Sequence, residues 1–160
     1  MSKPVQIAYL EISGRQTGKS HRLAEQGKAV VAQGKHAILV CSPSLAPYFR
    51  RLFPWMVVVS NSQRLPMGVN PDTAVWFYDE FDWLKSVVVR PGAYYSSTAR
   101  YLRVAGEPAA EDDVLMQLLE ANGNKCETHL TEINHDAMRY WRVEMSPEQF
   151  RLNALGAFLS

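Results

Sequence analysis

The chain has 160 residues, of which 47% are hydrophobic and 21% charged, and its formal net charge is +1 at pH 7. This size and composition fit one globular domain that buries a core without metal or disulfide support. The two cysteines, Cys41 and Cys126, form neither a zinc pattern nor a disulfide framework, which favours a reducing cytoplasm. We assign none of the four histidines to a metal.

The charges are unevenly distributed along the chain. Residues 1–71 contain nine Lys and Arg and two acids, whereas residues 107–160 contain four Lys and Arg and ten acids. This asymmetry permits a basic face for the phosphates of a nucleotide or a nucleic acid. For any single basic residue, a solvated side chain without a partner is an equally good explanation.

The first half of the chain alternates between apolar runs and helical patterns. Residues 5–12 predict a buried strand that ends at a Ser-Gly turn. Residues 19–33 have apolar side chains at helical spacing, and Gly34 follows where a left-handed cap belongs. The next predicted elements are a strand over residues 36–41, a short helix over 44–52 and a strand over 55–59.

The second half continues this alternation. We predict a strand over residues 74–78, a short helix over 81–85, one or two strands at 87–89 and 93–95, a helix over 111–121, and a last helix that begins at Ser146 and Pro147. Strands that alternate with helices indicate an α/β fold of three layers, with a central, mainly parallel sheet flanked by helices. We expect the strands ending at Ile12 and Tyr78 to lie near the middle of this sheet.

The turn after the first strand resembles a phosphate-binding loop. Residues 13–20 read Ser13-Gly14-Arg15-Gln16-Thr17-Gly18-Lys19-Ser20, close to the pattern G-x-x-x-x-G-K-[ST] with serine at the first position. Glycines let backbone N–H groups face a ligand, and the helix that begins near Lys19 adds the positive end of its dipole. We expect these eight residues to bind nucleotide, with Lys19 on the β- and γ-phosphates and the Ser20 hydroxyl on Mg²⁺.

Two adjacent acids follow the strand predicted over residues 74–78. We expect Asp79 to hold the Mg²⁺ shell and Glu80 to orient and deprotonate an attacking water, in the crevice at the carboxyl ends of the strands. Since one Mg-nucleotide has to touch both motifs, Lys19 and Asp79 should lie within about 10 Å of each other. The alternative is a pair of surface acids. Asp82 is expected to be solvated rather than catalytic.

Hydroxyl and arginine side chains near this crevice are further candidates. Ser96, Ser97 and Thr98 end an apolar run and could sense the γ-phosphate, although a polar turn between strand and loop is an alternative reading. Arg15 is our candidate for an arginine finger supplied within the chain, and the alternative is that it points to solvent or to DNA phosphates. Arg90, Arg100 and Arg103 are weaker finger candidates.

These motifs resemble those of one family, the ATPases of viral large terminase subunits that package phage DNA. Residues 14–20 resemble the family's phosphate loop, residues 75–80 its hydrophobic-Asp-Glu motif, residues 95–98 its coupling motif, and the stretch over 145–159 its link to a nuclease. The resemblance implies a RecA-like P-loop fold of the ASCE class, with ATP and Mg²⁺ as ligands and catalytic roles for Glu80 and Arg15. We expect one ATPase domain over residues 1–160 and no nuclease domain.

The resemblance also implies partners and a setting. It implies hydrolysis coupled to packaging or translocation of double-stranded DNA, in the cytoplasm of an infected bacterial host. Portal protein, small terminase, a separate nuclease or further copies of the chain are the implied protein partners. Two alternatives stay open: a P-loop kinase of small molecules, and a regulator that binds nucleotide without turning it over.

Overall fold

The computed structural model describes residues 5–60, 63–104, 107, 110–130 and 135–159. Within these residues, five parallel strands form one sheet in the order β1-β5-β4-β2-β3. The strands are β1 (Tyr9–Ile12), β2 (Ala37–Cys41), β3 (Val57–Ser60), β4 (Val75–Asp79) and β5 (Tyr94–Ser97). Because all five run in the same direction, the residues that follow them gather at one edge of the sheet.

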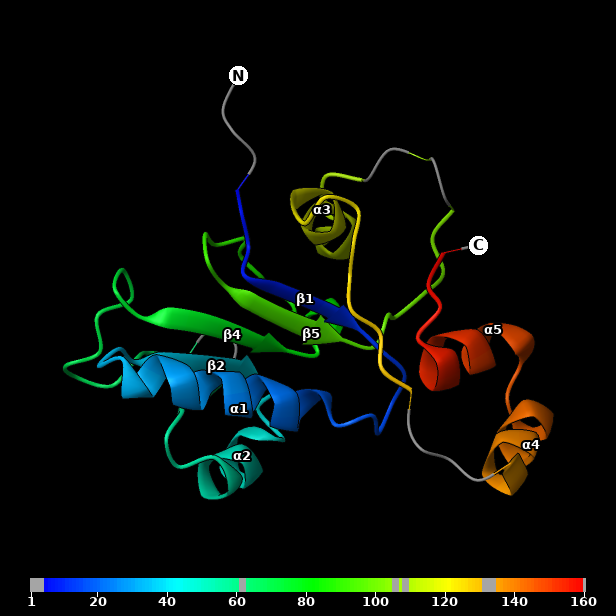
Figure 1. Cartoon of the computed structure of the whole chain (residues 1–160), viewed down its shortest axis with the longest axis horizontal. Helices are drawn as coiled ribbons and strands as arrows, with labels where there is room; N and C mark the ends of the chain where they lie inside the picture. Colours follow the sequence, from blue (N-terminus) through cyan, green and yellow to red (C-terminus); the bar gives the residue numbers. More distant parts are fainter. Residues whose placement is uncertain (1–4, 61–62, 105–106, 108–109, 131–134, 160) are drawn as a thin grey trace.

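Helices cover both faces of the sheet (Figure 1). Helices α1 (Lys19–Ala32) and α2 (Ala46–Leu52) pack on one face, and α3 (Val114–Ala121) packs on the other. Helices α4 (His135–Glu144) and α5 (Pro147–Phe150) lie beyond the carboxyl ends of β1, β4 and β5, and a π-helical turn, Arg151–Leu155, follows α5. The architecture is therefore α/β with three layers.

Strand β2 shows why the sequence folds into these layers. All five of its residues are buried, and successive side chains point to opposite faces. Leu39 packs with Leu23 of α1 and Phe49 of α2, whereas Ile38 belongs to the cluster that contains Leu115 of α3. A strand buried on both faces has to be apolar at every position, which is the pattern of residues 37–41.

The strand order corrects one expectation from the sequence. Strand β4 lies in the middle of the five strands, as expected, but β1 lies at one end of the order. The free edge of β1 is partly covered by Glu127, whose carbonyl accepts a hydrogen bond from the Ile12 amide and whose amide donates to the Leu10 carbonyl, both at 2.9 Å. The reason is that β4 and β5, although later in the sequence, insert between β1 and β2.

The predicted helices and strands are largely confirmed, with shifts at their ends. Ser146 caps α5 with a complete capping box to Gln149, and Gly34 has the left-handed φ of 82°. The predicted helix over 81–85 is only a short 3₁₀ turn, Phe81–Trp83, and residues 87–89 are not part of a strand. Helix α4 was not predicted. Among the described residues, no helix combines the length and apolar character needed to cross a bilayer.

Candidate nucleotide site

The loop between β1 and α1 has the backbone that its glycines predict. Gly18, immediately before α1, has φ of 83°, and Gln16 has φ of 57°. The Lys19 Nζ donates a hydrogen bond of 2.7 Å to the Gly14 carbonyl, and the Thr17 hydroxyl donates to the same oxygen at 3.0 Å. Lys19 is buried although it carries a charge, because the loop wraps around it. The loop is therefore compact, with its lysine held inside.

A partly buried ion pair that the sequence did not predict fixes the second half of this loop. Arg22 donates two hydrogen bonds to the Glu11 carboxylate, at 2.8 and 2.6 Å, and a third to the Thr17 carbonyl at 2.5 Å. Burial raises the pKa of Glu11, but the bonds from Arg22, Ser13 and Tyr9 outweigh burial and hold that pKa below its ordinary value. The sequence held a signal for this pair, because Glu11 lies inside a predicted buried strand and a buried acid needs a partner.

Asp79 and Ser20 meet directly below the loop. The Ser20 hydroxyl donates a hydrogen bond of 2.7 Å to the Asp79 carboxylate, which is 1% exposed. Burial raises the pKa of Asp79 to about 7, because the Ser20 bond and the charge of Lys19 offset only part of the desolvation. The start of α1 and the end of β4 are therefore in direct contact.

Glu80 turns toward the loop lysine. It has a left-handed φ of 52°, which a glutamate adopts rarely and which directs the chain out of β4 into the 3₁₀ turn. One oxygen of its carboxylate accepts a hydrogen bond of 3.2 Å from the Thr98 amide, and the other lies 3.4 Å from Lys19 Nζ. Glu80 is thus oriented by the Thr98 amide, just after β5, on one side and by Lys19, at the start of α1, on the other.

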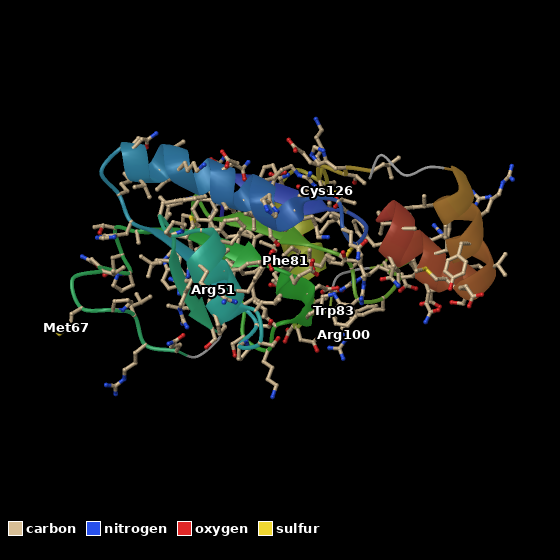
Figure 2. All side chains as sticks on the ribbon, turned by 90° about the horizontal axis from the view of Figure 1, so that it is seen from below. Arg51, Met67, Phe81, Trp83, Arg100 and Cys126 are labelled. Atoms are coloured by element: carbon tan, nitrogen blue, oxygen red, sulfur yellow. The ribbon has the colours of Figure 1, made fainter. Side chains whose placement is uncertain are left out.

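A cavity of about 350 Å³ joins these groups. Its lining combines the loop, Glu80, the end of the 3₁₀ turn and the segment before α2: Arg15, Gln16, Lys19, Ser42, Leu45, Glu80, Trp83 and Leu84. Arg15 lies with its guanidinium carbon 5.5 Å from the centre of the Trp83 ring, and Arg100 lies 5.6 Å from the same ring. Figure 2 shows Trp83 and Arg100 together at the surface, with Phe81 farther inside the molecule.

The hydroxyl residues at the end of β5 lie between the loop strand and the acid strand. Ser96 is in register with Glu11 of β1 and with Asp79 of β4. The Ser97 hydroxyl donates to the Thr98 carbonyl and accepts a hydrogen bond from the Asp82 amide. The Ser96 and Thr98 hydroxyls are buried and have no hydrogen-bond partner among the described residues. Buried polar groups without partners are uncommon and point to a missing ligand or water.

Two of the weaker arginine-finger candidates, Arg103 and Arg90, have side-chain partners outside the cavity. Arg103 is 6% exposed and forms ion pairs with Asp82 at 2.9 Å and with Asp113, the N-cap of α3, at 3.1 Å. Asp82 is therefore part of an ion triad, with its side chain only 9% exposed, which corrects the expectation that it is solvated. Arg90 stacks on the Trp76 ring at 3.9 Å and donates to the Tyr78 hydroxyl. Of the four arginines considered, Arg15 lines the cavity and Arg100 lies against the ring of Trp83, which also lines it.

Comparison of the chain with models of protein families, with curated proteins and with solved structures finds no match.

Proposed function

We propose that this protein is a Mg²⁺-dependent ATPase of the P-loop class, with a RecA-like fold and with ATP bound by residues 13–20. The observation that carries the proposal is the meeting of two distant motifs at one cavity. Lys19 Nζ lies 3.4 Å from the Glu80 carboxylate, and Ser20 donates a 2.7 Å hydrogen bond to Asp79. A phosphate-binding loop and an Asp-Glu pair in this arrangement are the parts that nucleotide hydrolysis needs.

The loop offers the donors that a triphosphate needs. The dipole of the 14-residue helix α1 begins at Lys19, and anions bind favourably at such a helix end. The Nζ of Lys19 now donates to the Gly14 carbonyl, and a β- or γ-phosphate oxygen is a better acceptor because it is charged. We therefore expect Lys19 to exchange a loop carbonyl for a phosphate when nucleotide binds.

The residues below the loop fit a magnesium ion. Mg²⁺ is held in such sites by one or two protein oxygens together with phosphate oxygens and waters. Asp79 and Ser20 supply a buried carboxyl group and a hydroxyl in contact, and burial is the main cause of the raised pKa of Asp79. The described residues contain no cluster of three or more His, Cys, Asp or Glu. A Mg-nucleotide site does not need such a cluster, because phosphates and waters supply most of its ligands. Bound Mg²⁺ would neutralise charge on the β- and γ-phosphates.

Four side chains have roles in hydrolysis under this proposal. Glu80 accepts a proton from the attacking water, and the Thr98 amide holds its carboxylate in place for that step. Arg15, at the cavity wall, stabilises the charge that develops on the transferred phosphoryl group. Ser96, in register with Asp79, and Thr98, whose amide donates to Glu80, would respond to the γ-phosphate through their unpartnered hydroxyls.

The biological task follows from the resemblance to terminase motors rather than from the geometry. We propose double-stranded DNA as the substrate of translocation or packaging, in the cytoplasm of a phage-infected bacterium. The excess of Lys and Arg in residues 1–71 is compatible with contact to phosphates. A portal protein, a small terminase, a nuclease or further copies of this chain would be the protein partners.

The test is an assay of phosphate release from MgATP, with and without double-stranded DNA, in parallel with a screen for phosphoryl transfer to small acceptors. Steady release of phosphate, faster with DNA, is the expected result. Transfer to an acceptor in preference to water would identify a kinase. Binding of ATP without release or transfer would identify a nucleotide-binding regulator.

A further inference from the structure

The phosphate loop is in backbone contact with the C-terminal segment, residues 151–159. The contact is made through Gly14 and Gly156. A Cβ atom on Gly14 would lie 2.5 Å from the Ala154 carbonyl oxygen and 2.6 Å from that of Asn153. A Cβ atom on Gly156 would lie 2.8 Å from the Gly14 nitrogen and from Ser13 backbone atoms. Real Cβ atoms do not approach other atoms so closely, so both positions exclude any side chain.

A hydrogen bond joins the same two segments. The Arg15 amide donates to the Asn153 carbonyl at 2.5 Å. This carbonyl lies in the π-helical turn Arg151–Leu155, and π-helical turns leave the regular helix pattern and often occur at functional sites. Gly156 ends this turn with a left-handed φ of 69°. One backbone donor of the loop is thus bound by protein before any ligand arrives.

The C-terminal segment is itself firmly anchored. Leu152 and Phe158 are buried in the core cluster that contains Ile12 and Leu115. The Phe158 carbonyl accepts a hydrogen bond from the Arg103 amide at 2.6 Å, and the Arg151 side chain donates to the Leu159 carbonyl. Because the C-terminal segment is anchored in this way, it gives the loop a fixed surface to pack against.

The loop is therefore clamped at two points. Arg22 holds the carbonyl of Thr17 in its second half, and the carbonyl of Asn153 holds the amide of Arg15 in its first half. Between these points lies Gln16, with its left-handed φ of 57°. The positions of the backbone N–H groups that would face a ligand therefore depend on these two contacts.

We propose that residues 153–156 are a positioning element of the phosphate loop and that nucleotide binding and the order of this C-terminal segment are coupled. The coupling to nucleotide rests on the proposed function, whereas the positioning of the loop does not. Coupling of this kind is reciprocal: if the segment favours the binding-competent loop, bound nucleotide stabilises the segment by the same free energy. Through the C-terminal segment, nucleotide binding would then also affect the helices α4 and α5.

The structure supplies a matched pair of variants. Gly156 and Gly123 both have φ of 69°, but a Cβ on Gly123 would meet nothing within 4 Å. Gly156→Ala and Gly123→Ala therefore carry the same backbone strain, and only Gly156→Ala pushes on the loop. We expect Gly156→Ala to weaken MgATP binding about tenfold or more, within the usual range of coupling between sites. Gly123→Ala should stay within about twofold of the wild type, too small a change to reflect such coupling.

Hydrogen exchange gives a readout that needs no nucleotide. In Gly156→Ala the Arg15 amide should exchange faster than in Gly123→Ala, because its bond to Asn153 is disturbed. Equal exchange at Arg15 and equal MgATP affinity in the two variants would overturn the proposal. If the wild type bound no ATP, the proposed function would fail, and exchange at Arg15 would still decide the positioning.

A measurement on the wild type covers the case in which Gly156→Ala does not fold. Saturating MgATP should slow exchange of the Ala157 amide, which donates to the Arg151 carbonyl within the segment. Amides at the C-terminal end of α1, which lies away from both the cavity and the C-terminal segment, serve as the internal control (Figure 1). Unchanged exchange at Ala157 under conditions in which ATP is bound would contradict the coupling.

Discussion

Lys19 Nζ lies 3.4 Å from a carboxylate oxygen of Glu80, and the two side chains are brought together from the start of α1 and the end of β4. The lysine side chain is 5% exposed and the glutamate 31%, so the pair faces the cavity from its inner wall. A γ-phosphate bound by Lys19 would lie beside Glu80, where an attacking water has to be held. The first prediction follows from this position.

Lys19→Ala should abolish productive nucleotide binding. Removing the charge from the loop should weaken MgATP affinity by about a hundredfold or more, equivalent to about 2.7 kcal/mol. Lys35→Ala is the matched control, since Lys35 is exposed just after α1. Titration calorimetry of both variants measures the effect. Equal MgATP affinity of Lys19→Ala and Lys35→Ala would show that Lys19 does not contribute to the nucleotide site.

Arg15→Ala should separate binding from turnover. We expect affinity for MgATP within a few-fold of the wild type and hydrolysis slower by about 10³, the lower end of arginine-finger effects. Arg51→Ala on α2, whose side chain is exposed (Figure 2), is the control and should hydrolyse normally. Unchanged hydrolysis with a salt-sensitive loss of DNA binding would instead assign Arg15 to DNA. The finger would then be Arg100 or a residue of a neighbouring subunit.

Asp79 should make the stability of the ligand-free protein depend on pH. The pKa of Asp79 is about 7 in the folded protein because of burial, against 3.8 ordinarily. Between these values the folded state retains a proton that the unfolded state releases, so this group's contribution to stability is complete at low pH and is lost as the pH rises toward about 7. Relative to Asp79→Asn, the wild type should therefore become less stable as the pH rises.

Urea unfolding of the wild type and Asp79→Asn, at about pH 5 and about pH 8, measures this difference. Asp72→Asn is the control, because Asp72 is exposed in the loop before β4. A difference between wild type and Asp79→Asn that is the same at both pH values would mean that Asp79 is ionised throughout.

Arg103→Met should destabilise the fold. It leaves the carboxylates of Asp82 and Asp113 buried without their partner, which typically costs about 3–5 kcal/mol. Arg100→Met, at an exposed neighbouring position, should cost less than about 1 kcal/mol. Guanidinium unfolding curves of the two variants check the prediction. Equal midpoints would show that the triad contributes little to the fold.

Local patterns in the sequence were sufficient to predict the elements that carry the candidate site. Apolar runs predicted β1 and β4, and the glycines of the loop and the lysine at the start of α1 follow a pattern set by short-range geometry. Asp79 and Glu80 were found because they directly follow a buried strand. Each of these signals spans fewer than about ten residues, the range in which periodicity and turn chemistry are informative.

The remaining features depend on contacts between distant residues. The insertion of β4 and β5 between β1 and β2 leaves no trace in any one segment. The Glu11–Arg22 pair needs β1 and α1 to be packed together, and the approach of Gly156 to Gly14 needs the whole chain to be folded. Asp82 was expected in solvent because its partner Arg103 comes from the segment after β5.

Glu80→Gln tests the central claim most directly, since it removes only the charge that would activate water. The measurement is paired: MgATP affinity and the rate of phosphate release, for the wild type, Glu80→Gln and the exposed control Glu25→Gln on α1. We predict ATP binding in all three, and release slower by about two to four orders of magnitude in Glu80→Gln alone. Release by Glu80→Gln at the wild-type rate would contradict the assignment of Glu80 and, with it, the proposed mechanism of hydrolysis.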